Sequence, residues 1–144
     1  MTVRTIVVGV DGSPTAQRAL RWSAELAAPL GANVVAVHGF EPLAWLGRVE
    51  PPVEFTRIAA HVRDLMEGEW CASARELGVR LETMVINDSP DAALRQVASE
   101  RDADLVVVGS RGHGAVKRLL LGSTARRLVD AADLPVTIIP ASPD

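Results

Sequence analysis

Five short apolar runs alternate with longer segments of helical periodicity in this chain. The runs are rich in β-branched residues and span 5–10, 33–40, 79–86, 104–109 and 134–139. Runs that are apolar on both faces are typical of strands that are covered on both sides. The patterns between them predict helices at about 14–28, 55–77, 91–101 and 122–132. This alternation predicts an α/β fold, an open parallel five-stranded sheet with helices on both faces.

Turn motifs mark where the predicted helices begin and end. Ser13 is suited to cap the first helix, and Pro14 fits its first position, where the N–H has no helical partner. The stretch 87–90, Asn-Asp-Ser-Pro, has the same form before the third helix. Gly78 is the expected terminator of the second helix. The chain between these signals therefore divides into compact strand and helix units.

The proline-rich stretch 41–54 lacks periodicity, and we interpret it as a long surface loop. It carries Trp45 together with Leu43 and Leu46. These apolar side chains are suited to a lid over a ligand or to a partner surface, and they are equally suited to folding back on the core. The sequence leaves these alternatives open.

Composition narrows the class of protein. The chain has 144 residues, which predicts one domain over 1–144. Its net charge of −3 gives no broad basic field, which argues against a nucleic-acid-binding protein. No stretch approaches the roughly 20 apolar residues of a membrane span. The single cysteine, Cys71, excludes an internal disulfide and a multi-cysteine metal site, and the start lacks the features of a signal peptide. We therefore expect a cytoplasmic protein without membrane contact.

The segment 109–124 carries the strongest functional signal. Gly109 and Gly112 let the backbone turn sharply and approach a ligand closely. Gly122, Ser123 and Thr124 stand at a helix start, where free amide groups and the helix dipole favour a phosphate. The segment and the helix after it are also locally basic through Arg111, His113, Lys117, Arg118, Arg126 and Arg127. This combination predicts a site for an anionic ligand at the carboxyl ends of the strands.

The spacing glycine, two residues, glycine, nine residues, glycine and serine resembles the motif of nucleotide-binding members of the universal stress protein family. The resemblance extends over the whole chain, from the first strand to the Pro-Val-Thr-Ile-Ile-Pro sequence at 135–140. It implies a sheet of strand order 3-2-1-4-5, of the adenine nucleotide alpha hydrolase-like type. It also implies that the chain binds an adenine nucleotide, ATP, with a divalent ion such as Mg²⁺ shared by the phosphates.

The resemblance also implies roles for individual residues. Asp11, with Gly9 and Val10, matches the wall near the adenosine. Gly39 stands where the family often has an aliphatic residue on the adenine, so packing on the base would be weaker here. The remaining implied contacts cover the ribose and phosphates through Gly109, Ser110, Arg111, Gly112 and His113, and hold the phosphates through Gly122, Ser123 and Thr124.

The resemblance further implies a homodimer through the last strand, Val136–Ile139. Pro135 and Pro140 bracket that strand, and prolines at strand ends are typical of a sheet edge. An exposed apolar edge is otherwise a liability, so pairing with a second copy would suit it.

Several residues keep a structural interpretation beside the functional one. Asp11 serves either a ligand or the turn into the first helix, and the glycine loop is either a phosphate site or a plain connection. His38 is expected as a packed residue at the core edge, and His113 as a residue near phosphate or solvent rather than a general acid or base. Cys71 is expected to be a buried, inert thiol. Helical spacing allows only one of Arg126 and Arg127 to face a ligand.

These features predict an ATP-binding regulatory module of the stress response. The alternative is a slow ATP hydrolase or phosphotransferase, and a third possibility is a protein that works through its dimer surface without nucleotide. The sequence has no Gly-Lys-Ser/Thr and no Gly-x-Gly-x-x-Gly after the first strand, which disfavours a Walker-type enzyme and a dinucleotide enzyme. No catalytic residue is assigned.

Overall fold

The computed structural model describes residues 2–40, 51–111 and 121–142, and the side chains of 51–54 are left out of the description. Five strands form one parallel sheet: β1 (Thr5–Gly9), β2 (Asn33–Phe40), β3 (Arg80–Asn87), β4 (Leu105–Gly109) and β5 (Val136–Ile139). Their order is β3-β2-β1-β4-β5, which confirms the predicted topology. The predicted strand ranges differ from these bounds by two residues at most.

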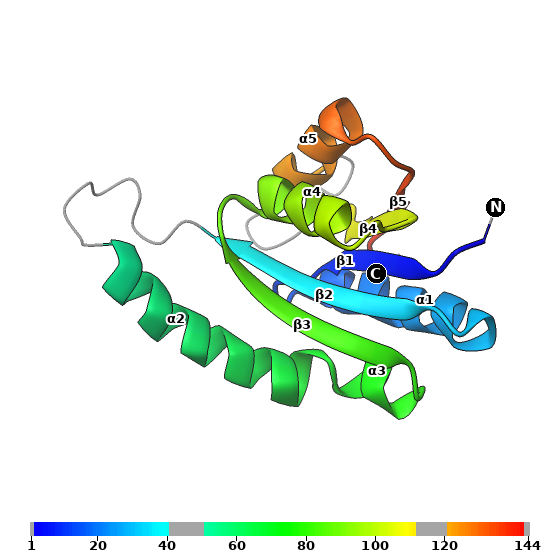
Figure 1. The fold of residues 1–144 in the computed structure, drawn as a ribbon, viewed down its shortest axis with the longest axis horizontal. Coiled ribbons are helices and arrows are strands. Elements are labelled where there is room, and N and C mark those ends of the chain that lie inside the picture. Colours follow the sequence, from blue (N-terminus) through cyan, green and yellow to red (C-terminus); the bar gives the residue numbers. More distant parts are fainter. Residues whose placement is uncertain (1, 41–50, 112–120, 143–144) are drawn as a thin grey trace.

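Helices cover both faces of the sheet (Figure 1). One face packs against α1 (Pro14–Leu30), α2 (Pro51–Leu65), the π-helical turn η1 (Met66–Trp70) and α3 (Ala72–Glu76), and the other against α4 (Pro90–Glu100) and α5 (Ser123–Ala131). The alternation of side chains along each strand explains the two cores. In β1, Ile6 and Val8 face α1, whereas Val7 faces α4, and all three are fully buried.

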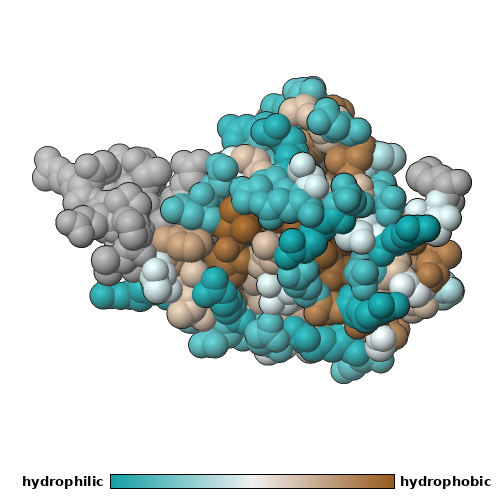
Figure 2. All heavy atoms as spheres, viewed as in Figure 1, coloured by the Kyte–Doolittle hydropathy of each residue, from teal (hydrophilic) through white to brown (hydrophobic). Residues whose placement is uncertain are grey.

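The edge strand β3 is less covered than the centre of the sheet. Its residues Leu81, Met84 and Ile86 are only half-buried. On the face of the molecule seen in Figure 2, most surface residues are hydrophilic, and hydrophobic atoms gather along the sheet between α2 and α4. None of the helices in the described part of the chain is both long enough and apolar enough to span a membrane.

The helix starts agree in part with the predicted capping. The Ser13 hydroxyl accepts a hydrogen bond from the Ala16 amide at 3.2 Å, and Pro14 opens α1, as expected. Before α4, Pro90 takes the first position, but the Ser89 side chain makes no capping bond. Ser89 is the N-cap residue, as expected, but without the side-chain bond; the Asp88 carboxylate accepts the Ser89 amide at 2.8 Å. That carboxylate bond holds the turn.

The predicted helix over 55–77 is wrong in two respects. The helix begins at Pro51, so the last four residues of the predicted loop are helical, because proline is tolerated in the first turn. The rest of that loop, 41–50, with Trp45, lies outside the described residues. The helix is also interrupted by η1, which brings Trp70 against Gly12. The last part, α3, ends just before Gly78, and Gly78 itself has the left-handed conformation expected of a helix terminator.

Cys71 is fully buried at the end of the π-helical turn, as expected of an inert thiol. Burial raises the pKa of this thiol to about 11. At pH 8 its thiolate is therefore about 100-fold scarcer than that of an ordinary cysteine.

We expect a chromogenic disulfide reagent at pH 8 to label the native protein at least about 100-fold more slowly than the protein unfolded in urea. The single cysteine makes the absorbance signal unambiguous. Equal labelling rates in the two states would contradict the buried placement.

Candidate functional site

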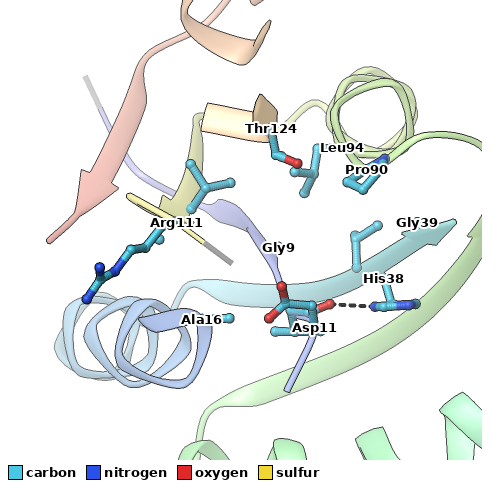
Figure 3. Close-up of a pocket in the computed structure, with 13 residues that line it drawn as sticks. Gly9, Asp11, Ala16, His38, Gly39, Pro90, Leu94, Arg111 and Thr124 are labelled. Atoms are coloured by element: carbon cyan, nitrogen blue, oxygen red, sulfur yellow. Dashed lines mark hydrogen bonds between the residues drawn. The ribbon is translucent and has the colours of Figure 1, made fainter. Parts of the chain in front are cut away.

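A pocket opens at the carboxyl ends of β1, β2 and β4, where the strand order reverses (Figure 3). This is where open α/β sheets place their ligands. It encloses about 540 Å³ of empty space, part of which is open to solvent. Thirteen residues line it: Gly9, Val10, Asp11, Ala16, Val37, His38, Gly39, Pro90, Leu94, Val108, Gly109, Arg111 and Thr124.

One wall of the pocket is apolar and comes from β2 and α4. Pro90 and Leu94 project from the first turns of α4 beside Gly39 (Figure 3). A Cβ at Gly39 would lie 2.6 Å from the Cβ of Ala93 and 3.1 Å from the Asp88 carbonyl oxygen. The glycine is therefore required by the close approach of α4 to β2. The apolar surface that is absent at position 39 is supplied by the helix.

Polar groups occupy the opposite side, at the end of β1. The Asp11 carboxylate accepts a hydrogen bond from the Ser13 amide at 2.9 Å, and it also lines the pocket. Both interpretations of Asp11 are thus compatible with its position. The carboxylate fixes the turn into α1 and is presented to whatever fills the pocket.

His38 is half-buried between Phe40 and Trp70, with ring centroids 5.5 Å from each, so it is packed at the core edge as expected. Its Nδ1 lies 2.7 Å from the Val10 carbonyl oxygen. A carbonyl oxygen only accepts hydrogen bonds, so Nδ1 carries the proton and Nε2 of the neutral ring is an acceptor. His38 also lines the pocket, which the sequence interpretation did not include.

The end of β4 is tied to the start of α5. The Gly122 amide donates to the Ser110 carbonyl oxygen at 2.7 Å, and the Ser110 amide donates to that of Ile139 at 2.8 Å. Gly122 is the N-cap, so the amides of Ser123, Thr124 and Ala125 have no partner within the helix. The Gly122 amide is thus used within the protein, and the donors left at this helix start are the amides of the three residues after it.

Glycine is needed at position 109 for a different reason from the one expected. Its φ is not positive, so no sharp left-handed turn requires it. A Cβ there would lie 2.6 Å from Cγ2 of Thr15 and 3.1 Å from the Thr15 backbone. The glycine lets β4 end directly against α1. Arg111 follows at the pocket rim, and Figure 3 shows its guanidinium directed away from Asp11 and Thr124.

Seven of the residues expected in the site line the pocket: Gly9, Val10, Asp11, Gly39, Gly109, Arg111 and Thr124. Ser110, Gly122 and Ser123 stand beside it without lining it, and Gly112 and His113 lie outside the described residues. The sequence interpretation missed six: Ala16, Val37, His38, Pro90, Leu94 and Val108. Val108 directly precedes the last residue of β4, and Val37 lies three residues before the end of β2, so their nearness to strand ends could have indicated them.

No group of three or more His, Cys, Asp or Glu side chains is arranged to hold a metal ion within 2–40, 55–111 and 121–142. Asp11 is the one carboxylate among the described residues that line the pocket. A divalent ion at this site would therefore need ligands beyond these side chains.

The model of the universal stress protein family matches residues 2–140. The chain belongs to the universal stress protein family. A universal stress protein of Thermus aquaticus is 37% identical over 140 residues, covering 94% of this chain and 98% of the relative. The universal stress protein Rv2624c of Mycobacterium tuberculosis is 31% identical over 148 residues, or 99% of this chain. This chain spans only half the length of that mycobacterial relative.

Two solved structures of universal stress proteins share the fold and carry nucleotides. One, in complex with cAMP, is 26% identical, with a TM-score of 0.69 and coverage of 99% of this chain and 100% of that one. The other, from Archaeoglobus fulgidus in complex with dAMP, is 27% identical, with a TM-score of 0.70 and coverage of 96% and 97%. Both ligands are adenine nucleotides.

Proposed function

We propose that this universal stress protein binds ATP in the pocket at the ends of β1, β2 and β4, and acts as a nucleotide-dependent regulatory module of the stress response. The observation that carries the proposal is that an apolar wall and a helix N-terminus meet in one pocket. An apolar wall suits a purine, and a helix N-terminus suits phosphates. The related structures in complex with cAMP and dAMP support an adenine nucleotide.

The base would lie against Leu94 and Pro90, over the backbone of Gly39, with Gly9 and Val10 at its other edge. The ribose would lie near Asp11. This arrangement compensates for the missing aliphatic side chain at position 39, because α4 supplies the apolar contact in its place.

The phosphates would lie along 109–111 and reach the free amides of Ser123 and Thr124, with the Thr124 hydroxyl as a further donor. Ser110 and Gly122 would act indirectly, since their mutual hydrogen bond sets the position of this helix start. Mg²⁺, where present, would bind mainly through the phosphate oxygens.

The proposal includes pairing of two copies through β5. This strand hydrogen-bonds to β4 alone within the described sheet and ends it. Its residues Val136, Thr137 and Ile138 are half-buried rather than covered. An apolar edge of this kind is suited to a second copy of the chain.

Binding is tested by the stability of the protein in ATP. At an ATP concentration 100 times the dissociation constant, we expect the free energy of unfolding to rise by about 2.7 kcal/mol. For a domain of this size that corresponds to a rise in Tm of about 5–10 °C, which calorimetry measures directly.

The matched pair Gly122→Asp and Gly122→Asn locates the site. Gly122 has φ −65° and ψ 162°, which any residue adopts, and both new side chains are good helix N-caps. Only aspartate adds a negative charge where the phosphates would lie. We expect Gly122→Asp to abolish the Tm shift and Gly122→Asn to keep it. An equal shift in both variants, or none in the unchanged protein, would contradict the proposal.

A further inference from the structure

Asp91 is a buried carboxylate beside the pocket without a good partner. It lies in the first turn of α4, between Pro90 and Leu94, and its side chain is only 11% exposed. Its Oδ1 makes no hydrogen bond with any residue that the structure describes. A buried carboxylate oxygen is normally satisfied, so this one calls for an explanation.

Asp91 is paired with Arg127 on the facing helix, α5. Nη1 of Arg127 lies 3.7 Å from Oδ1 of Asp91, close enough for an ion pair but too far for a hydrogen bond. A guanidinium carries several N–H donors in one plane and can serve two anions at once. The contact therefore places a positive charge beside the first turn of α4, next to Pro90 of the pocket wall, and Asp91 takes none of the guanidinium's hydrogen bonds.

The position of Arg127 on α5 directs it toward the pocket. It follows Thr124, which lines the pocket, by three residues, so the two side chains share one face of the helix. Helical side chains also lean toward the N-terminus, which brings the guanidinium back toward Thr124. Figure 3 shows Thr124, Leu94 and Pro90 on the same side of the pocket, where α4 and α5 meet.

The other described arginines near α5 are placed differently. Nη2 of Arg126 donates to the Leu121 carbonyl oxygen at 3.4 Å, just before its own helix. The guanidinium of Arg111 is directed away from the pocket (Figure 3). Only one of Arg126 and Arg127 can face a ligand, and this geometry favours Arg127.

We infer that Arg127 contacts the phosphate chain of the bound nucleotide and that Asp91 is a positioning residue that holds it at the rim. This inference rests on the proposed nucleotide binding. An unrestrained arginine side chain is highly mobile, and anchoring it beforehand reduces the entropy lost when a phosphate binds. Asp91 lies in the first turn of α4, where the helix dipole favours a negative charge, and its burial there makes it a fixed anchor.

The test compares adenosine, AMP and ATP by calorimetric titration, because only the nucleotides carry phosphates. We expect Arg127→Ala to reduce the preference for ATP over adenosine about tenfold, as the loss of one charge-assisted hydrogen bond would do, and to leave adenosine affinity unchanged. Arg126→Ala is the matched control, since it removes the same charge from the neighbouring position. It should change the preference by less than about twofold.

The positioning role of Asp91 is tested by asking whether its effect on ATP preference requires Arg127. We expect Asp91→Asn to reduce the ATP preference about threefold in the unchanged background, and to have no effect on it in Arg127→Ala protein. A general structural role of Asp91 would lower affinity for adenosine as well, in both backgrounds.

The failures of the two proposals are distinguishable. If the unchanged protein binds none of the three ligands, the proposed nucleotide site is wrong, and this inference with it. If all three bind and Arg127→Ala weakens them equally, or Arg126→Ala has the same effect as Arg127→Ala, only the assignment of Arg127 is wrong. A rise in ATP preference in Asp91→Asn would overturn the positioning role.

Discussion

Replacement of Leu94 by alanine is expected to lower the free energy of unfolding by about 2–5 kcal/mol. Leu94 is 1% exposed and packs in the core between α4 and the sheet. A Cβ built on Gly9 would lie only 3.2 Å from its Cδ1, so the leucine methyls fill the space that the glycine leaves. Truncation removes apolar contacts and opens a cavity that this rigid part of the fold cannot close.

The same substitution on the surface is the control. Leu30 is the last residue of α1 and is 53% exposed, so Leu30→Ala should change stability by no more than about 0.5 kcal/mol. Urea denaturation followed by circular dichroism measures both variants. Leu94→Ala should also weaken ATP binding, because Leu94 forms part of the proposed base wall. Similar losses in the two variants would mean that Leu94 is not a core residue.

The layered architecture could be predicted because its signals are local or nearly so. The residues of β1 are apolar on both faces, and that pattern alone requires layers on both sides of the sheet. Gly78 and Pro14 act through their own backbone conformations, and Ser13 acts through a hydroxyl bond to an amide three residues later, so the sequence indicates the helix ends that they mark. The order of the strands came from the family resemblance rather than from these signals.

The composition of the pocket could be predicted only in part. Asp11 and Thr124 stand at the ends of elements, and the sequence indicates those ends. Pro90 and Leu94 enter the pocket because α4 packs directly on β2, a contact between segments about 50 residues apart. No local pattern specifies how closely two such elements approach. The same limitation concealed the contact between Gly109 and Thr15.

The π-helical turn could not be predicted from the sequence for a related reason. The apolar spacing over 55–77 fits a regular helix, and the interruption at Met66–Trp70 changes the phase by a fraction of a turn. Its consequence is tertiary. Trp70 lies against Gly12, whose φ of +82° places it in the left-handed region, and near the ring of His38. The turn thus supports the strand ends that carry Asp11 and Val10.

The tight packing of α4 on β2 leads to the second large effect. Gly39→Ala should lower the free energy of unfolding by about 1–3 kcal/mol, because the new Cβ would lie 2.6 Å from Cβ of Ala93. The backbone of Asp88 and Pro90 lies at 3.1 Å, so the start of α4 must move away. That movement would displace Pro90 from the proposed base wall and weaken ATP binding. Urea denaturation and calorimetric titration measure the two effects.

Two further variants separate this steric conflict from the general effect of replacing glycine. Gly68 has open space around it, so Gly68→Ala should be neutral or raise stability by up to about 1 kcal/mol. Ala93→Gly removes the nearest atom, and in the double variant it should recover part of the loss, with a coupling of at least about 0.5 kcal/mol. Strictly additive effects would show that the two positions are not in contact. A coupling without recovery of ATP binding would place the damage at Asp88 and Pro90 instead, because their backbone stays close to the new Cβ in the double variant.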